Sequence, residues 1–287
     1  GCAVTVFEKS RGLGGRCSSR RWQNCVVDHG AQYWTMRDAG FRGEVERTLG
    51  PALGRIEAPI LEGADRQPVY GEYFYHQEGN SRLCRALSQG VPVQLECPVI
   101  PERVLGGGWR VGGQIFDRVI ATAPWPQVAG WFSSAGESGL DAPFVPCLAA
   151  WFLFGEEPRG LAATAYAIRP EGTSTLAWTA CENHKVGRVG PGHSLFLGHA
   201  TETFSRQFWA EPAELWSQAM LESVVAEWDL DPGREVARGW HRWRYARVTG
   251  RVLVPEFPEG FRCVGDGVAG RSRVETAWLS GRTVDVG

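Results

Sequence analysis

The first sixteen residues constrain the fold more than any other part of this sequence. A short β-branched run from Val4 to Phe7 is followed at once by Glu8, and a glycine-rich turn ends at Arg16. A strand that ends in an acidic residue is typical of dinucleotide-binding folds, where the carboxylate accepts hydrogen bonds from a ribose hydroxyl. The glycines let the backbone approach an anion closely, and Arg16 can hold phosphate through two parallel bonds. The spacing of the glycines and Arg16 by itself fits a phosphate-binding turn and an ordinary surface turn with a solvated arginine equally well.

A similar pattern returns at the C-terminal end of the chain. Residues 261–267 read F-R-C-V-G-D-G, and a helix is predicted from about Arg273. Further helices are predicted at 38–50, 80–88 and 212–228, the last with a proline in its first turn. Strands are predicted at 91–95, 116–123, 147–154, 164–169, 174–180, 194–200 and 235–246, and residues 106–108 are predicted to form a hairpin turn.

This order of elements predicts a discontinuous domain. The α/β pattern occupies both ends, and the middle is a mixed, mostly antiparallel stretch, as when a second domain is inserted into a nucleotide-binding one. We expect residues 1–60, 90–125 and 255–287 to form the nucleotide-binding domain. Residues 61–89 and 126–254 are expected to form the inserted domain, which would hold the substrate.

Composition excludes several classes of protein. A chain of 287 residues that is 43% hydrophobic and 22% charged is too apolar for disorder, and a net charge of −2 argues against a nucleic-acid partner. No apolar run approaches the roughly 18–20 residues that span a bilayer, and no secretory signal is visible, so we expect a cytoplasmic protein without a transmembrane segment. The eight cysteines form no C-x-x-C pair, so we expect reduced thiols and no metal site.

Three longer motifs occur in a fixed order along the chain. The first is V-T-V-F-E-K-S-R-G-L-G-G-R-C-S-S-R-R, followed shortly by V-D-H-G-A-Q-Y-W; the second is H-R-W-R-Y-A; the third is F-R-C-V-G-D-G-V-A-G-R-S-R-V-E-T-A-W-L-S-G-R. In this order they resemble the FAD-dependent amine oxidase superfamily, most closely its renalase-like branch. The resemblance implies an α/β fold, in which a Rossmann-like FAD/NAD(P)-binding domain carries an inserted α+β substrate domain with a mixed or antiparallel sheet.

The resemblance also shows a difference at the N-terminus. The superfamily opens with a strand and a G-x-G-x-x-G loop about thirty residues before the position of Glu8. The N-terminus of the helix that follows this loop holds the pyrophosphate. The printed sequence starts after that point. We infer a misplaced start codon or a truncated fragment, and expect an incomplete Rossmann-like domain. We therefore expect this chain to bind FAD weakly or not at all, and a version extended upstream to bind it tightly.

The resemblance assigns most of the cofactor site. Glu8, with Lys9 beside it, would hold the adenosine ribose, and the backbone around Val99 would read adenine. The glycine turn with Arg16 would face the pyrophosphate and ribityl chain, and the segment 30–33 would pass close to the isoalloxazine. The cofactor-binding residues expected on this basis are Glu8, Lys9, Gly14, Gly15, Arg16, Gly30, Ala31, Gln32, Tyr33, Val99, Gly265, Asp266, Arg273 and Val274.

The last helix has a further expected role. Its free N–H groups and dipole, beginning at Arg273 and Val274, would point at the flavin O2 and N1 atoms and stabilise the anionic reduced flavin. Gly265 would permit close approach, and Asp266 would accept a hydrogen bond from the ribityl chain or lie at the pyrophosphate. The alternative is an ordinary amphipathic helix at the end of the chain.

The predicted strand at 235–246 supplies the expected substrate face. Because side chains alternate along a strand, His241, Trp243 and Tyr245 share one face, and Trp240, Arg242 and Arg244 share the other. We expect the first three, with Gln32, to form the catalytic set, lining a cavity that also borders the last helix. The alternative is a half-buried sheet with aromatic core residues. His184, His193 and His199 are expected to be surface or core residues, and His29 receives no role.

These expectations combine into a hypothesis about function. The resemblance implies FAD, hydride transfer from a small heteroaromatic or dihydronicotinamide-type substrate to flavin N5, and molecular oxygen as the acceptor. Hydride abstraction needs chiefly positioning and no strong general base. This agrees with a chain whose only lysines are Lys9 and Lys185. The alternatives are an amine or amino-acid oxidase or desaturase of the same superfamily, and a non-catalytic fragment without flavin.

Overall fold

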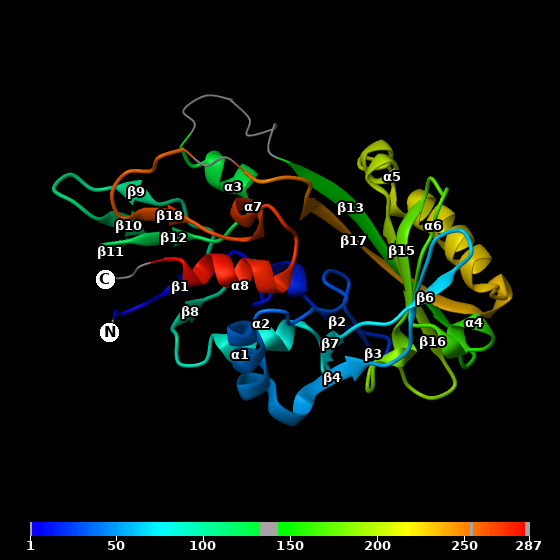
Figure 1. The fold of residues 1–287 in the computed structure, drawn as a ribbon. Coiled ribbons are helices and arrows are strands. Elements are labelled where there is room, and N and C mark those ends of the chain that lie inside the picture. Colours follow the sequence, from blue (N-terminus) through cyan, green and yellow to red (C-terminus); the bar gives the residue numbers. More distant parts are fainter. Residues whose placement is uncertain (1, 133–142, 253–254, 285–287) are drawn as a thin grey trace.

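The computed structural model describes residues 2–132, 143–252 and 255–284, which form two lobes connected by long strands (Figure 1). The first, here called the terminal lobe, brings both ends of the chain together. Its parallel pairs join β1 (Val6–Phe7) to β8 (Val93–Gln94) and β12 (Val119–Ala121) to β18 (Phe261–Cys263). Strands from the two ends of the sequence therefore lie in one lobe, and α8 (Val274–Arg282) lies beside them.

The second lobe, here called the sheet lobe, is built on a seven-stranded sheet in the order β17-β13-β16-β15-β14-β5-β6. All neighbouring strands are antiparallel except β14 and β5, so the prediction of a mixed, mostly antiparallel sheet is confirmed. The strands are β5 (Ile60–Glu62), β6 (Gln67–Val69), β13 (Phe144–Phe154), β14 (Ala167–Arg169), β15 (Leu176–Cys181), β16 (Ser194–Ala200) and β17 (Glu235–Val248).

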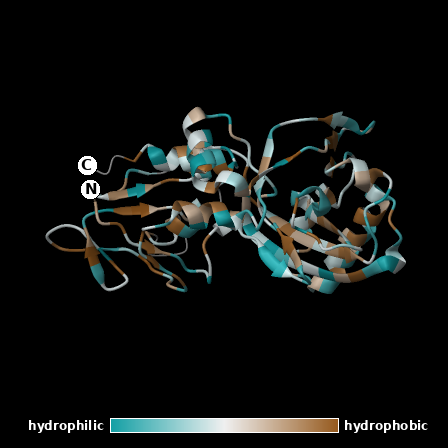
Figure 2. Cartoon of the chain, turned by 90° about the horizontal axis from the view of Figure 1, so that it is seen from below, coloured by the Kyte–Doolittle hydropathy of each residue, from teal (hydrophilic) through white to brown (hydrophobic). Residues whose placement is uncertain are grey.

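The long strand β13, next to the edge strand β17, is buried on both faces. Leu148, Ala150 and Phe152 pack on the side of α5 (Glu202–Gln207) and α6 (Ala213–Trp228). Trp151 and Leu153 point the opposite way, into a second cluster that includes residues of the terminal lobe. Figure 2 shows hydrophobic residues concentrated in the strands inside both lobes. This two-sided burial explains why β13 reads as a continuous apolar run rather than an alternating one.

Short hairpins and helices complete the molecule. Hairpins pair β2 (Arg20–Trp22) with β3 (Cys25–Val27), and β10 (Trp109–Val111) with both β9 (Glu102–Arg103) and β11 (Gln114–Phe116). β4 (Leu53–Ile56) pairs antiparallel with β7 (Tyr73–His76), with β5 and β6 between them in the chain. The helices are α1 (Ala39–Leu49), α2 (Ser81–Leu87), α3 (Trp125–Ala129), α4 (Leu161–Thr164) and α7 (Asp266–Ala269), and Gly15–Cys17 forms the short 3-10 helix η1. The expected helices at 38–50, 80–88 and 212–228 are confirmed.

One expected boundary differs from the structure. The range 61–89 was expected to belong to the inserted domain, but only β6 and the end of β5 join the seven-stranded sheet. β7 and α2 instead pack through Phe74 and Leu83 against Phe41 of α1, with Val274 and Trp278 of α8 at the edge of this cluster. Apolar contact with the terminal lobe therefore decides the placement of this segment.

Candidate functional site

A cleft of about 3050 Å³ is lined by residues of both lobes. It brings together sixteen of the seventeen residues expected in the site: Glu8, Lys9, Gly14, Gly15, Arg16, Gly30, Ala31, Gln32, Tyr33, Val99, His241, Trp243, Tyr245, Asp266, Arg273 and Val274. The remaining one, Gly265, lies just outside, where its N–H donates to Ser280 Oγ at 3.0 Å. Residues separated by more than two hundred positions in the sequence thus converge on one surface.

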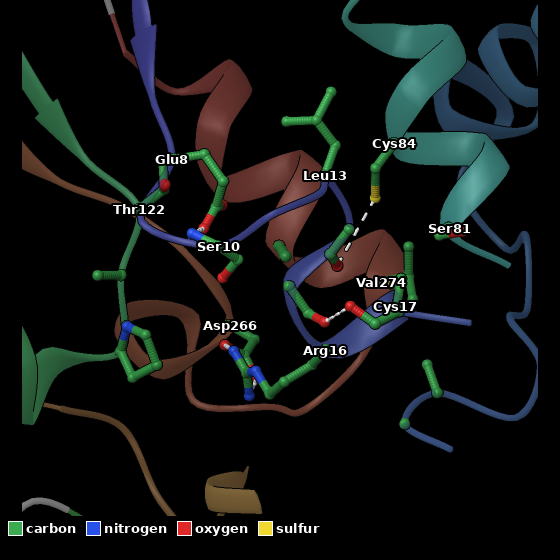
Figure 3. Close-up of a pocket in the computed structure, with 18 of the residues that line it drawn as sticks. Glu8, Ser10, Leu13, Arg16, Cys17, Ser81, Cys84, Thr122, Asp266 and Val274 are labelled. Carbon is green, nitrogen blue, oxygen red and sulfur yellow. Dashed lines mark hydrogen bonds and ion pairs between the residues drawn. The ribbon is translucent and has the colours of Figure 1, made fainter. Parts of the chain in front are cut away.

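The glycine turn lines one wall of this cleft. Gly14 has φ 130° and Gly15 has φ 50°, values that side chains with a Cβ rarely adopt, so the turn requires glycine. The Glu8 carboxylate accepts from the Ser10 backbone N–H at 2.7 Å, which fixes the start of the turn (Figure 3). The Lys9 side chain does not join this turn but donates to Gln127 Oε1 at 3.0 Å.

Arg16 makes a contact that the sequence did not predict. Its guanidinium forms two parallel bonds to the Asp266 carboxylate, at 2.8 and 2.5 Å, and a third to the Ala246 carbonyl at 3.3 Å (Figure 3). Ser272 Oγ also donates to Asp266 at 3.1 Å. Two residues expected to contact the cofactor separately are therefore paired with each other, and the pair connects the glycine turn to α7 and β17.

The segment from His29 to Tyr33 lies directly against the glycine turn. A Cβ on Gly30 would fall 2.1 Å from the Arg16 carbonyl oxygen, and the Ala31 N–H donates to the same oxygen at 2.8 Å. Asn80 Nδ2 donates to the carbonyls of Ala31 at 2.8 Å and Gln32 at 3.1 Å, which holds the segment from its other side. Gly30 is therefore required by close packing of two backbones.

The Gln32 side chain is buried and turned back on its own segment. Its Nε2 donates to the Asp28 carbonyl, and its Oε1 is buried without a hydrogen-bond partner among the described residues. Tyr33 points toward the sheet lobe, where its hydroxyl accepts from Arg169 at 3.1 Å and its ring lies 4.6 Å from that of Tyr73. Gln32 therefore holds its own segment in place, whereas Tyr33 lies among aromatic side chains at the sheet lobe.

A buried charge cluster lies behind this segment. Asp28 accepts from Arg188 Nη2 at 2.6 Å, from Lys185 Nζ at 3.3 Å and from the Asn80 N–H at 3.0 Å, and Lys185 also binds Glu182 at 2.9 Å. All four charged side chains are fully buried. Burial alone would raise the pKa of Asp28, but the charges of Lys185 and Arg188 hold that pKa below its usual value. Asp28 therefore stays ionised and anchors the segment.

The sheet lobe presents a row of side chains to the cleft. Strand register places Trp178, His199, Ala149 and His241 opposite one another on four successive strands, and Trp243 opposite Cys147 in the next row. Because direct partners share a face, these residues line one surface of the sheet. His241, Trp243 and Tyr245 all line the cleft with Gln32, Arg273 and Val274, whereas Arg242 stacks 5.5 Å over Trp216 of α6 on the other face.

Two histidines without an assigned role join this row. The His29 carbonyl accepts from Trp243 Nε1 at 2.8 Å and hydrogen-bonds His199 Nε2 at 3.2 Å. The His29 ring lies 4.9 Å from that of His241 and stacks 5.3 Å from that of Trp243. His29 stands inside the V-D-H-G-A-Q-Y-W motif, which could have drawn attention to it. His199 was expected at the surface or in the core, and no sequence signal placed it at the cleft.

The three imidazoles are neutral at neutral pH. Burial lowers the pKa of His29 to about 3, with further contributions from His241 and Arg20. Burial also lowers the pKa of His199 to about 4, and burial with the Arg20 charge lowers that of His241 to about 4. These rings therefore offer hydrogen-bonding groups and flat apolar surface rather than positive charge.

The start of α8 forms another part of the cleft wall. No side chain caps the helix at Arg273, and Arg273 and Val274 line the cleft. The next residue, Glu275, is buried and accepts from the backbone N–H groups of Arg37 and Asp38 at 2.5 and 2.6 Å. The helix is thereby fixed to the segment that follows Tyr33, with its N-terminal turn beside the cleft.

The described residues form neither a metal centre nor a membrane-spanning helix. No group of three or more His, Cys, Asp or Glu side chains within residues 2–132, 143–252 and 255–284 is placed to hold a metal ion. In the same ranges no helix has the length and apolar character to cross a membrane. Every cysteine that the structure describes is a free thiol.

Comparisons with known proteins agree with this architecture. Residues 1–43 match the model of a family described as an NAD(P)-binding Rossmann-like domain. A protein from an Exiguobacterium strain, provisionally named a protoporphyrinogen oxidase, superposes with a TM-score of 0.73 at 13% identity, covering 98% of this chain and 91% of that one. Putrescine oxidase bound to putrescine gives 0.69 at 10% identity, with coverages of 99% and 92%.

A more distant neighbour shares the same fold. A flavin-dependent halogenase superposes with a TM-score of 0.53 at 16% identity, covering 99% of this chain and 52% of that one. The expected fold class, a Rossmann-like nucleotide-binding domain carrying a mixed-sheet domain, is confirmed by these comparisons and by the strand pairing. At these identities the likeness establishes the fold, and the chemistry has to be argued from the cleft.

Proposed function

We propose that this protein is a FAD-dependent oxidoreductase that oxidises a small molecule in the cleft between its two lobes. The observation that carries the proposal is the convergence of the glycine turn, the 29–33 segment, the start of α8 and the aromatic row of the sheet on one cleft. A nucleotide-binding wall thus faces a substrate-sized surface across a shared space, which is where a redox cofactor and its substrate must meet.

The residues present fit FAD. Glu8 offers a carboxylate for the adenosine ribose, Val99 lines the cleft and would contact adenine, and the left-handed backbone of Gly14 and Gly15 leaves room for a pyrophosphate. The uncapped start of α8 offers backbone N–H donors to an electron-rich ring edge. In this proposal Arg16, Gly265 and Asp266 act together, because the Arg16–Asp266 pair shapes the wall at the ribityl chain. Lys9, Ala31 and Tyr33 complete the lining.

The remaining chemistry consists of positioning. When bound, FAD supplies a hydride acceptor. The chain contributes a flat surface from His241 and Trp243, whose ring centroids are 4.3 Å apart, and Tyr245 and Gln32 also line the cleft. Such a surface orients a planar substrate and excludes water around it. The imidazoles of His29, His199 and His241 are neutral, so none of them has to lose a proton before a substrate binds.

Within this class we propose a renalase-like oxidase acting on a small heteroaromatic or dihydronicotinamide-type substrate, with molecular oxygen as acceptor. Among the described residues that line the cleft, leaving out Arg242 and Arg244 on the other face of β17, ten arginines and Lys9 accompany only three acidic residues, Glu8, Asp117 and Asp266. All three acids belong to the terminal lobe. No described carboxylate of the sheet lobe lines the cleft to hold an ammonium group, which disfavours the amine oxidase alternative.

Reduction of the bound flavin tests this proposal. The protein is loaded with FAD, freed of oxygen, and mixed separately with dihydronicotinamide isomers and with primary amines while the flavin absorption is followed. We expect a dihydronicotinamide isomer to bleach the flavin, and oxygen to restore the colour with formation of hydrogen peroxide. Protein that never takes up FAD would contradict the flavoprotein assignment. Bleaching by amines alone would contradict the renalase-like assignment.

A further inference from the structure

Arg20 lies at the edge of the substrate surface without a carboxylate partner among the described residues. It is exposed on β2, and its guanidinium lies 5.5 Å from the ring centroid of Trp151, next to the His29–His241–Trp243 cluster. Arg169 occupies a comparable place over Trp178 at the other end of the row, but it is paired with Glu62 at 2.8 Å. Of these two stacked arginines, only Arg20 keeps its charge uncompensated.

The groups around Arg20 add polarity without adding charge. Burial lowers the pKa of His29 and of His241, and the nearby Arg20 charge lowers both further, so both rings are neutral. His29 is 4% exposed, and its ring is hydrogen-bonded to the Val27 backbone.

The charge of the whole cleft also favours an anionic ligand. The chain has a net charge of −2, whereas the described cleft lining, leaving out Arg242 and Arg244 on the other face of β17, includes eleven basic and three acidic residues. Field lines concentrated in such a cleft raise the local concentration of anions and repel cations. The glycine turn and Arg16 account for positive character at the nucleotide wall. Arg20 lies instead beside the imidazoles of the substrate surface.

We propose that Arg20, with His29 and His241 beside it, forms a subsite for an anionic group carried by the substrate, a phosphate or a carboxylate. The inference rests on the proposed function, since it specifies the substrate of the same cleft. Stacking on Trp151 holds the planar guanidinium in place, and its donor fork matches the oxygen spacing of phosphate and carboxylate. The flat part of the substrate would then lie on Trp243, and its anionic group would point to the edge of the cleft.

Binding of three related probes tests the subsite. Nicotinamide mononucleotide carries a phosphate, nicotinic acid riboside carries a ring carboxylate, and nicotinamide riboside carries neither group. Titration calorimetry is run on FAD-loaded protein, with bound flavin measured separately. We expect one of the anionic probes to bind about tenfold more tightly than nicotinamide riboside, which corresponds to one charge-assisted hydrogen bond. Comparison of the two anionic probes identifies which anion the subsite accepts.

Substitutions then locate the effect. Arg20→Gln is expected to abolish the tenfold preference, and Arg20→Lys to restore part of it. The matched control is Arg103→Gln, because Arg103 is also an exposed arginine stacked on a tryptophan, 5.4 Å over Trp109, but lies outside the cleft lining. Equal binding of all three probes, or a preference that survives Arg20→Gln, would overturn the subsite even when FAD binds normally. Loss of FAD binding in the unsubstituted protein would instead count against the proposed function.

Discussion

At the scale of single residues, the closest packing in the cleft wall involves Gly30. Its backbone lies against that of Arg16 with no room for a side chain, although its φ is not in the left-handed region. The requirement for glycine therefore comes from the approach of two segments, whereas Gly14 and Gly15 are required by their own backbone conformation. The motif G-A-Q-Y marked Gly30 in the sequence, but only the structure gives the reason.

Gly30→Ala is expected to destabilise the protein by about 1–3 kcal/mol, the range typical of overpacking a tight site. The added methyl group would force the Arg16 carbonyl away and break the hydrogen bond from the Ala31 N–H. Urea unfolding measures the change. Gly43→Ala is the control, because a Cβ at that helical position meets nothing within 4 Å and is expected to stabilise by up to about 1 kcal/mol. Equal stability of the Gly30 variant and the wild type would contradict this packing argument.

The buried imidazoles give a second prediction, on pH. His199 has a folded-state pKa of about 4, below the ordinary value of 6.5, so the unfolded chain binds its proton more readily than the folded chain does. Stability is therefore fully present above about pH 6.5 and is lost as the pH falls toward 4. His199→Gln keeps an N–H donor for the His29 carbonyl but does not titrate. Thermal melts between pH 7 and 4 should show a shallower loss for this variant; an unchanged slope would contradict a neutral, buried His199.

At the scale of elements, β17 shows how far the alternation of side chains along a strand predicts the face on which each side chain lies. His241, Trp243 and Tyr245 were expected on one face, and all three line the cleft. The ladder with β13 is irregular here, since Trp243 is opposite Cys147 and Arg247 is opposite Val145. This irregularity adds two residues to β17, so the period of two is preserved through it. An odd number of added residues would have turned the face over, and the sequence contains no signal that distinguishes the two cases.

The buried charge cluster is the element-scale feature that sequence reasoning missed. Lys185 was regarded only as a rare lysine, and its pairing with Asp28 joins positions 157 residues apart. Neither an aspartate in a motif nor a lysine in a loop indicates its partner. The cluster connects the 29–33 segment to the loop after β15, so we assign Asp28 a positioning role for the cleft wall.

Asp28→Asn is expected to destabilise folding by about 3–5 kcal/mol, because it leaves two buried cations with Glu182 as their only carboxylate within this cluster. The surface control is Glu72→Gln, which breaks the exposed Glu72–Arg42 pair and should cost no more than about 1 kcal/mol. Chemical denaturation of both variants measures the difference. Similar small losses for the two variants would show that the buried cluster does not hold the segment.

At the scale of the whole molecule, the parts that the sequence predicted are those with local signals. The strand and turn around Glu8, the helix at 212–228 and the apolar run of β13 each carry their own pattern, and motif order placed the two ends in one lobe. The pairing of Arg16 with Asp266, the arrival of His199 at the cleft and the packing of β7 and α2 on α1 depend on long-range contacts. A single sequence contains no pattern for such contacts.

The central claim, that the cleft holds FAD between a nucleotide wall and an aromatic wall, is tested most directly by titrating FAD into the protein up to saturating concentration. Quenching of tryptophan fluorescence reports occupancy, because Trp243 and Trp178 line the cleft. In line with the expected weak affinity of this chain, we predict weak but saturable binding of one FAD per chain, with still weaker binding after Glu8→Gln and of FMN, which lacks the adenosine half. Absence of saturation, or equal binding of FAD and FMN that is unaffected by Glu8→Gln, would contradict the account.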